Sequence, residues 1–172
     1  MNLAKLAGRF APVVIAALLS LSLAGCANQV PDPASNLTGS GDANGPVLPG
    51  SARDFSVNVG NIVYFTTDST DLTPDAQNTL RSQAGWLSKY PQYTITLEGH
   101  ADERGTREYN LALGAKRAQA AKAFLIEQGI SADRLVTISY GKEAPACFES
   151  TEECRVQNRR ARFVMFTELP TS

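Results

Sequence analysis

The stretch Tyr93–Gly129, YTITLEGHADERGTREYNLALGAKRAQAAKAFLIEQG, decides the fold, because it joins a strand pattern to a helix pattern through a short polar loop. Its first residues alternate between apolar and polar, with Tyr93, Ile95 and Leu97 on one side, which is the period of a strand with one face on a core. After the loop, a helix is expected from about Arg107 to Gln128, and the glycine that follows is a fitting C-terminal cap. The stretch therefore predicts a strand, a loop and a long helix in succession.

Similar patterns continue on both sides of this stretch. Before it, Ile62–Phe65 is a β-branched and aromatic run typical of a strand, and Thr73-Pro74-Asp75 starts a helix that ends before Pro91. After it, two further strands are expected at Leu135–Tyr140 and Ala161–Thr167. The order β-α-β-α-β-β predicts an α+β fold, a two-layer sandwich with two main helices packed on one face of a single mixed sheet.

One arginine falls on the apolar side of the long helix. At about 100° per residue, Arg117 lies inside the arc that carries Leu113 and Phe124, whereas Lys116 lies outside it. Because arginine keeps its charge, a guanidinium that faces the protein body needs a carboxylate, a group of carbonyls or an anionic ligand. The loop before the helix contains Asp102, which we take as the neighbour of this arginine.

Two interpretations of the Arg117 and Asp102 pair remain open. In the first, the two side chains form a partly buried ion pair that stabilises the loop. In the second, they form an amphoteric site, in which Arg117 binds a carboxylate through two hydrogen bonds and Asp102 binds an ammonium group. The second interpretation predicts an amino-acid-like ligand.

The composition limits both the size of the protein and its class of partner. The chain has 172 residues, which accommodate one ordinary domain together with targeting and spacer segments. Its 16 basic and 17 acidic residues give a net charge of −1, which provides no field to attract a polyanion. We therefore expect no nucleic-acid partner.

The start of the chain has the pattern of an export signal. A basic beginning precedes an almost unbroken apolar run, Phe10 to Ala24, which is short and rich in Ser and Ala for a membrane-spanning helix. The run ends in Leu23-Ala24-Gly25-Cys26, which resembles the bacterial lipoprotein box. We expect residues 1–25 to be a signal peptide and Cys26 to carry acyl chains. A retained helix, or a chance cysteine after an ordinary signal peptide, are the alternatives.

A spacer is expected between this anchor and the domain. Residues 28–52 are rich in Pro, Gly, Ser, Asn and Asp and nearly lack large apolar side chains, so they bury no core. The predicted organisation is therefore a signal peptide at 1–25, the lipidated cysteine with a flexible linker at 26–52, and one domain at 53–172.

Two cysteines lie in the loop expected between the last two strands. Cys147 and Cys154 are seven positions apart in a chain that carries an export signal, and in exported proteins such pairs form disulfides. Neither a CxxC motif nor a nearby histidine accompanies the pair, so no metal site is expected. We predict a disulfide that stiffens the loop.

An enzyme is the main rival class of function. His100 is the only histidine of the chain, and with Asp102 and Glu103 it would have to supply the acid, the base or the metal ligands. This set is too sparse for a typical zinc site, and no GxSxG or SxxK motif supplies a nucleophile. We therefore expect no catalysis, and we expect the His100 side chain to be hydrogen-bonded to backbone.

Three segments of the chain resemble the OmpA-like, peptidoglycan-associating domain family, and within it the peptidoglycan-associated lipoproteins of the Tol-Pal system. They are EGHADERGTREYNLALGAKRAQAAKAFL at 98–125, ISYGKEAP at 138–145 and QNRRA at 157–161, in this order behind a lipoprotein box. The resemblance covers about residues 53–168, and it implies the OmpA-like fold.

The resemblance implies a ligand and the residues that hold it. In that family the ligand is meso-diaminopimelate in the stem peptide of the wall, which carries a second carboxylate and a second amine. Asp102 and Arg117 match the residues that hold these groups, and Asp68 and Leu113 match further residues of the site. Thr66-Thr67 stand where the common pattern has a glycine and an aromatic residue. The alternative for Asp68 is an aspartate that only forms a turn or a cap.

The roles of three other polar residues are less specific. Asn110 is expected to fix the backbone at the helix start through its amide. Arg159 and Arg160 have two interpretations: one of them faces the site or a partner, or both form a solvated pair beside the last strand.

The resemblance also implies a location and partners. In that family a residue other than Asp after the lipidated cysteine, here Ala27, permits transport to the outer membrane, so a lipid-anchored protein facing the periplasm is implied. TolB and other Tol-Pal components are the implied protein partners, and the implied role is envelope integrity and outer-membrane constriction at cell division. No cofactor is expected besides the covalent lipid. The alternative is a periplasm-facing protein-interaction module without direct wall binding.

Overall fold

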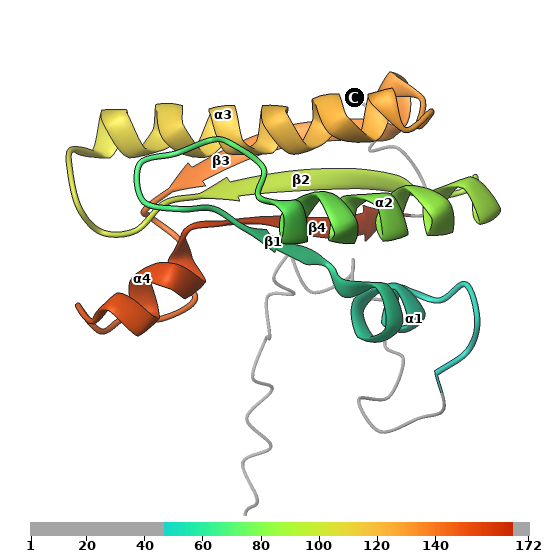
Figure 1. Ribbon diagram of the computed structural model, residues 1–172, viewed down its shortest axis with the longest axis horizontal. Helices are drawn as coiled ribbons and strands as arrows, with labels where there is room; N and C mark the ends of the chain where they lie inside the picture. Colours follow the sequence, from blue (N-terminus) through green and yellow to red (C-terminus); the bar gives the residue numbers. More distant parts are fainter. Residues whose placement is uncertain (1–46, 167–172) are drawn as a thin grey trace, which may run out of the picture. The chain divides into compact units, whose positions relative to one another are not determined.

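The structure, a computed structural model, describes residues 47–166 of the chain (Figure 1). The predicted signal peptide, the predicted lipid attachment at Cys26 and most of the predicted linker lie outside the described residues. The described residues all belong to one compact unit. Within this range, no helix is both long and apolar enough to cross a membrane.

Four strands form one mixed sheet in the order β1-β4-β2-β3 (Figure 1). They are β1 (Ile62–Tyr64), β2 (Thr94–His100), β3 (Leu135–Gly141) and β4 (Arg160–Phe166). Strand β4 is antiparallel to both of its neighbours, whereas β2 and β3 are parallel. Each strand lies where its sequence pattern predicts one, and the α+β fold is confirmed.

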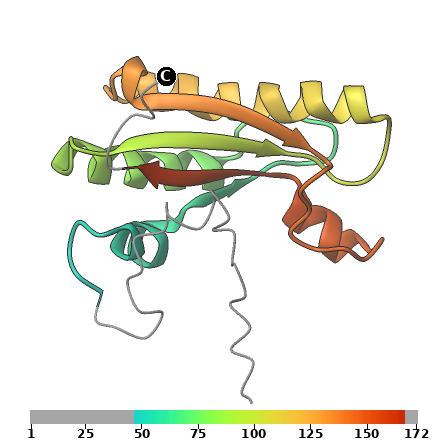
Figure 2. The same ribbon diagram turned by 180° about the vertical axis from the view of Figure 1, so that it is seen from behind.

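Two long helices cover one face of this sheet, in front of it in Figure 1 and behind it in Figure 2. Helix α2 (Pro74–Lys89) begins after Thr73, whose side chain accepts a hydrogen bond from the backbone N–H of Ala76. Helix α3 (Arg107–Glu127) begins in the same way after Thr106. Helix α2 starts where its predicted capping signal places it, α3 starts at the expected Arg107, and their common face agrees with the predicted two layers.

The core lies between the sheet and these helices. The alternation in β2 places Ile95 and Leu97 on this side with no exposed surface. Apolar residues of both helices pack against them: Leu80, Ala84, Leu87, Ala118, Ala121 and Leu125. This shared burial fixes α2 and α3 on the sheet.

Helix α3 lies very close to the sheet where two glycines meet. A Cβ atom on Gly99 would lie 1.8 Å from the carbonyl oxygen of Gly114, and a Cβ atom on Gly114 would lie 2.4 Å from the hydroxyl of Ser139. Since only hydrogen fits at both positions, this contact sets the height of α3 above β2 and β3. It also brings the first half of α3 next to the loop that follows β2.

The segment between β3 and β4 was expected to be a simple loop, but it contains α4 (Glu152–Asn158). Thr151 precedes this helix and accepts a hydrogen bond from the backbone N–H of Cys154. A helix of 7 residues is too short for an apolar period to identify it. A single 3₁₀ turn, η2 (Ala132–Arg134), precedes β3.

The first described residues already contact the rest of the fold. Helix α1 (Ala52–Asp54) continues into a π-helical segment, η1 (Phe55–Gly60). The ring N–H of Trp86 donates to the Asp54 carboxylate at 2.8 Å, and the Tyr93 hydroxyl donates to the carbonyl of Gly50 at 2.7 Å. Contacts with the sheet-and-helix body therefore begin just before residue 53, the expected start of the domain.

Candidate functional site

The candidate site lies at the carboxyl ends of β1 and β2. These strands point the same way, since each is antiparallel to β4, which lies between them. The loops that follow them therefore meet at one edge of the sheet, which is where open α/β sheets commonly bind ligands. The register places Tyr64 opposite Arg160 and Gly99 opposite Ala161, so the start of β4 lies at the same edge.

A cavity of about 280 Å³ opens at this edge. All four predicted binding residues line it: Asp68 after β1, Asp102 after β2, and Leu113 and Arg117 from α3. The other lining residues are Thr67, Arg104, Gly105, Tyr109 and Asn110. Pockets for drug-sized ligands measure roughly 300–1,000 Å³, so this one suits a group of amino-acid size.

Arg117 is fully buried and joins the loop after β1 to the end of β2. Its guanidinium donates to the backbone carbonyls of Thr66 (3.1 Å), Ser69 (3.0 Å) and His100 (2.9 Å). Burial lowers the pKa of Arg117 to about 10, although the negative charge of Asp102 acts to raise it. Because this value is well above 7, the side chain stays protonated at neutral pH. The expected ion pair with Asp102 is wrong, because a group of carbonyls receives this charge instead.

Two other arginines hold the Asp102 carboxylate. Arg104 Nη2 lies 2.7 Å from Oδ2, and Arg159 Nη1 lies 3.3 Å from the same oxygen. Burial acts to raise the pKa of Asp102, but the hydrogen bonds from Arg104 and Arg159 outweigh it and hold the pKa below its ordinary value. The Arg104 side chain is 45% exposed and that of Arg159 is 6% exposed. Asp102 therefore has one partner at the surface and one inside the fold.

Asp68 and Tyr109 border the cavity together. Asp68 adopts a left-handed backbone conformation with φ of 54°, as in a tight turn. The Tyr109 hydroxyl donates to the Asp68 carboxylate, and this hydrogen bond raises the pKa of the tyrosine. The turn interpretation of Asp68 and the ligand interpretation are compatible, since the residue forms the turn and also lines the cavity.

The structure shows the contacts of Asn110, Arg159 and Arg160, the other polar residues singled out from the sequence. The Asn110 amide donates to the carbonyls of Arg104 (2.7 Å) and Thr106 (3.1 Å), as expected of a residue that fixes the helix start. Arg159 and Arg160 are only 5% and 7% exposed, so the solvated pair is wrong. Arg159 faces the site, whereas Arg160 donates to the carbonyl of Ala144.

The three groups of the enzyme hypothesis do not converge. Only Asp102 lines the cavity, while the Glu103 carboxylate binds Arg155 at 2.8 Å. His100 stacks on Tyr140, and both of its ring nitrogens are buried without a hydrogen bond, so the expected bond to backbone is wrong. Among residues 47–166, no three His, Cys, Asp or Glu side chains are grouped so as to hold a metal ion.

The sequence analysis gave no role to two charged or aromatic residues of the lining, Arg104 and Tyr109, and left open the role of Arg159, which lies outside the lining but contacts Asp102. Tyr109 stands four positions before Leu113, which stands four positions before Arg117, so helical spacing already indicated that the three share a face. Arg104 follows Asp102 so closely that their pairing is local. Arg159 had no local signal, because it reaches Asp102 only through the pairing of β4 with β1 and β2.

The charges of the cavity lining are balanced. Two carboxylates, Asp68 and Asp102, face two guanidinium groups, Arg104 and Arg117. A ligand that carries both an ammonium and a carboxylate meets partners of opposite charge for each. A ligand of one charge only would meet like charges as well as opposite charges in this lining.

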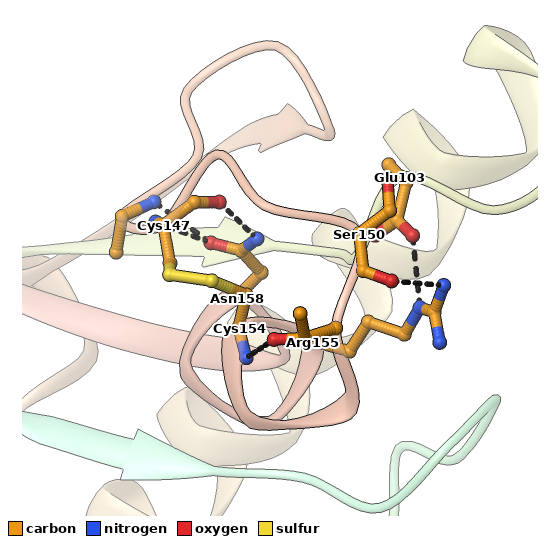
Figure 3. The surroundings of a disulfide bond; sticks show 8 residues. Glu103, Cys147, Ser150, Cys154, Arg155 and Asn158 are labelled. Atoms are coloured by element: carbon orange, nitrogen blue, oxygen red, sulfur yellow. Dashed lines mark hydrogen bonds and ion pairs between the residues drawn. A yellow bond between two sulfur atoms is a disulfide. The ribbon is translucent and has the colours of Figure 1, made fainter.

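A disulfide joins Cys147 to Cys154 beside this edge of the sheet (Figure 3). It connects the segment after β3 to α4, which contains Cys154. The predicted pairing is therefore present in the fold, on a segment that is partly helical.

Comparison with known proteins gives consistent similarities. The model of the family described as "OmpA family" matches residues 64–159. The chain is 58% identical over 156 residues to the peptidoglycan-associated lipoprotein of Agrobacterium fabrum, covering 90% of this chain and 87% of that protein. It is 37% identical to the protein of the same name from Pseudomonas aeruginosa, covering 89% and 94%. The crystal structure of the peptidoglycan-associated lipoprotein from Burkholderia pseudomallei is similar with a TM-score of 0.60 and 41% identity, covering 61% of this chain and 89% of that chain.

Proposed function

Because the chain belongs to the OmpA family and, within it, to the peptidoglycan-associated lipoproteins, we propose that it binds the cell wall through diaminopimelate. As a member of this family it is an envelope-associated binding protein and not an enzyme. The proposed ligand is the free end of meso-diaminopimelate in a stem peptide, which carries one ammonium and one carboxylate. The binding is non-covalent.

The observation that carries this proposal is the charge-balanced cavity between the loops after β1 and β2. Asp102 accepts the ligand's ammonium, and Arg117 uses N–H groups that are not bound to loop carbonyls to donate to the carboxylate. Leu113 packs against the methylene chain of the ligand, and Asp68 borders the ammonium side. This assignment gives each charged group of the ligand a partner in the lining.

Binding requires an exchange at Asp102, because its oxygens already accept hydrogen bonds from Arg104 and Arg159. The half-exposed Arg104 is the partner that leaves, since its side chain has solvent to move into, whereas Arg159 has not. The released guanidinium stays at the rim of the cavity, where it attracts the carboxylate of the ligand. The exchange replaces one cation on Asp102 by another.

The remaining parts of the proposal concern location. Acyl chains on Cys26 anchor the protein in the outer membrane, facing the periplasm, after removal of residues 1–25. The linker at 26–52 has a root-mean-square reach of about 25–30 Å if it behaves as a flexible chain. This reach lets the domain at 53–172 leave the membrane surface and find the wall.

We propose that TolB and the other Tol-Pal components are the protein partners. The family membership supports this assignment, and a TolB site that overlaps the cavity would make wall binding and TolB binding mutually exclusive. The resulting role is to maintain envelope integrity and to make the outer membrane follow the wall at division. No cofactor takes part besides the covalent lipid.

Co-sedimentation with insoluble peptidoglycan tests the proposal. The full chain, purified in detergent, is compared with Asp102→Asn and with a matched control, Asp71→Asn, which removes an exposed carboxylate from the loop of Asp68 but not from the cavity lining. We expect Asp102→Asn to weaken retention at least about tenfold, since a charge-assisted hydrogen bond is lost, and Asp71→Asn to match wild type. Equal retention of all three proteins would reject the binding site.

The second candidate is a protein-interaction module that does not touch the wall. It is favoured if wild-type protein fails to co-sediment with peptidoglycan and yet binds purified TolB. The same two variants, tested against TolB, then show whether that interaction uses the cavity.

A further inference from the structure

Helix α4 is tied at two points to the residues that precede it in the chain (Figure 3). The disulfide joins Cys154 to Cys147, and the side chain of Asn158, the last residue of α4, binds the backbone of Ala146 and Cys147. Asn158 Nδ2 donates to the carbonyl of Cys147 at 2.7 Å, and its Oδ1 accepts from the backbone N–H groups of Ala146 (2.8 Å) and Cys147 (3.1 Å). A short helix that would not be stable alone is thereby fixed against the loop before it.

This fixed segment reaches the loop of the candidate site through two arginines. The Arg155 guanidinium points to the Glu103 carboxylate (Figure 3), and its Nε donates to that group at 2.8 Å. Arg159, directly after α4, contacts Asp102. Two successive carboxylates of the loop after β2 are therefore each bound by one arginine of the α4 region. Glu152, at the start of α4, accepts from Arg159 at 2.9 Å and lies 3.7 Å from Arg155.

Arg159 differs from the other partner of Asp102 in how firmly it is held. Its Nε donates to the carbonyl of Phe65 at 3.3 Å, and its two terminal nitrogens bind Asp102 and Glu152. A guanidinium bound on every nitrogen and almost fully buried has one available orientation. The Asp102 oxygen that it contacts is consequently fixed relative to β1 and α4.

We propose that Arg159 is the positioning residue of the site: supported by Glu152 and the disulfide-linked α4, it fixes the Asp102 carboxylate in the orientation that receives the ligand's ammonium. The ligand chemistry in this inference rests on the proposed function, whereas the coupling of Arg159 to Asp102 does not. Arg159 does not touch the ligand, and it acts only through the carboxylate.

The test uses the full chain in detergent and four variants. Arg159→Gln removes the charge, Arg159→Lys keeps it without the planar fork, and Glu152→Gln removes the outer support, whose side chain is 55% exposed. Arg160→Gln is the matched control, because Arg160 is an adjacent buried arginine that does not contact Asp102. Each protein is titrated calorimetrically with the tripeptide L-Ala-γ-D-Glu-diaminopimelate and with the same tripeptide ending in 2-aminopimelate, which lacks the second amine.

A positioning role predicts a selective loss. Arg159→Gln should weaken the diaminopimelate tripeptide about tenfold but the aminopimelate tripeptide less than about twofold, because only the former uses Asp102. Arg159→Lys should recover part of the lost affinity. Glu152→Gln should weaken binding of the diaminopimelate tripeptide alone by about two- to threefold. Arg160→Gln should leave the ratio of the two affinities unchanged. Equal losses for both tripeptides in Arg159→Gln, or no loss, would overturn the inference.

A second measurement does not depend on any ligand. The Asp102 carboxyl carbon is followed by NMR as the pH is lowered, and its pKa should rise in Arg159→Gln and stay at the wild-type value in Arg160→Gln. An unchanged Asp102 pKa in Arg159→Gln would overturn the inference by itself. If wild type binds neither tripeptide, the proposed function fails and the Asp102 titration alone decides the role of Arg159. If Arg159→Gln does not fold, the selectivity of Glu152→Gln decides it.

Discussion

Replacing Arg117 by methionine should destabilise the whole fold, because this arginine organises the site before it binds anything. The side chain has no exposed surface, and it donates to two backbone carbonyls of the loop after β1 and to the last carbonyl of β2, at 2.9 to 3.1 Å. Hydrogen bonds to a charged group contribute about 1.5–3 kcal/mol each, so three of them amount to roughly 5–9 kcal/mol. Methionine no longer has to bury a charge, which returns several kcal/mol.

The expected net loss for Arg117→Met is therefore about 3–5 kcal/mol in the free energy of unfolding, within the range seen when a buried charged partner is removed. Urea unfolding followed by the fluorescence of Trp86, the only tryptophan, measures it. With a slope of about 2 kcal/mol per molar urea, the midpoint should fall by about 2 M. Lys116→Met, at the adjacent exposed position of α3, is the control and should shift the midpoint little. A loss below about 1 kcal/mol for Arg117→Met would refute the view that the loops depend on this guanidinium.

Three further predictions concern packing, pH and the disulfide. Gly114→Ala should cost about 1–3 kcal/mol in thermal unfolding, because its Cβ would lie 2.4 Å from Ser139 Oγ and 2.7 Å from Gly99 O. Gly85→Ala, at an exposed position of α2 with no atom near the added Cβ, should instead be neutral or stabilising, and a similar loss at both sites would contradict the contact. The stability that Asp102 contributes should be present above its unfolded pKa of 3.8 and be lost as the pH falls through its lower folded pKa, since the folded state holds the carboxylate ionised. The difference in stability between wild type and Asp102→Asn, measured by urea unfolding from pH 7 to pH 2, should therefore shrink below pH 4, and a difference that stays constant would contradict the pairing. Cys147→Ser with Cys154→Ser should lower the free energy of unfolding by about 2 kcal/mol under oxidising conditions and make it insensitive to dithiothreitol, and continued sensitivity to the reductant would contradict the bond.

Local signals in the sequence were sufficient to predict the main helices and strands, but not which strands lie next to one another in the sheet. Thr73-Pro74 acts on the adjacent backbone, so the start of α2 followed from a local signal. The position of β4 between β1 and β2 does not follow from any local pattern, since it depends on which strand ends can pair. Helix α4 was not predicted for a different reason. It is stabilised by the Thr151 cap, the Asn158 amide and the disulfide, and not by an apolar stripe that a sequence pattern could show.

The candidate site follows the same division. Helical spacing predicted that Arg117 faces inward and that Leu113 lies beside it, and both positions are correct. The predicted partner of Arg117 was wrong, because backbone carbonyls have no sequence signature. Those that bind Arg117 lie far apart in the chain, at Ser69 after β1 and at His100, the last residue of β2. The role of Arg159 required the same long-range information, since it contacts a residue 57 positions away.

The contrast between fixed and exposed arginines bears on how strongly such a site can hold the wall. Arg117 and Arg159 are buried and bound to the fold, so they cost little further ordering when a ligand arrives. Arg104 is half exposed and binds Asp102, so an ammonium that replaces it gains only the difference between two charge-assisted contacts on the same carboxylate. Under the proposed function, a single cavity is consequently selective for its ligand without holding it tightly. Under the same proposal, firm attachment of a membrane to a wall comes from many anchored copies that bind at once, while each copy remains free to exchange its partner.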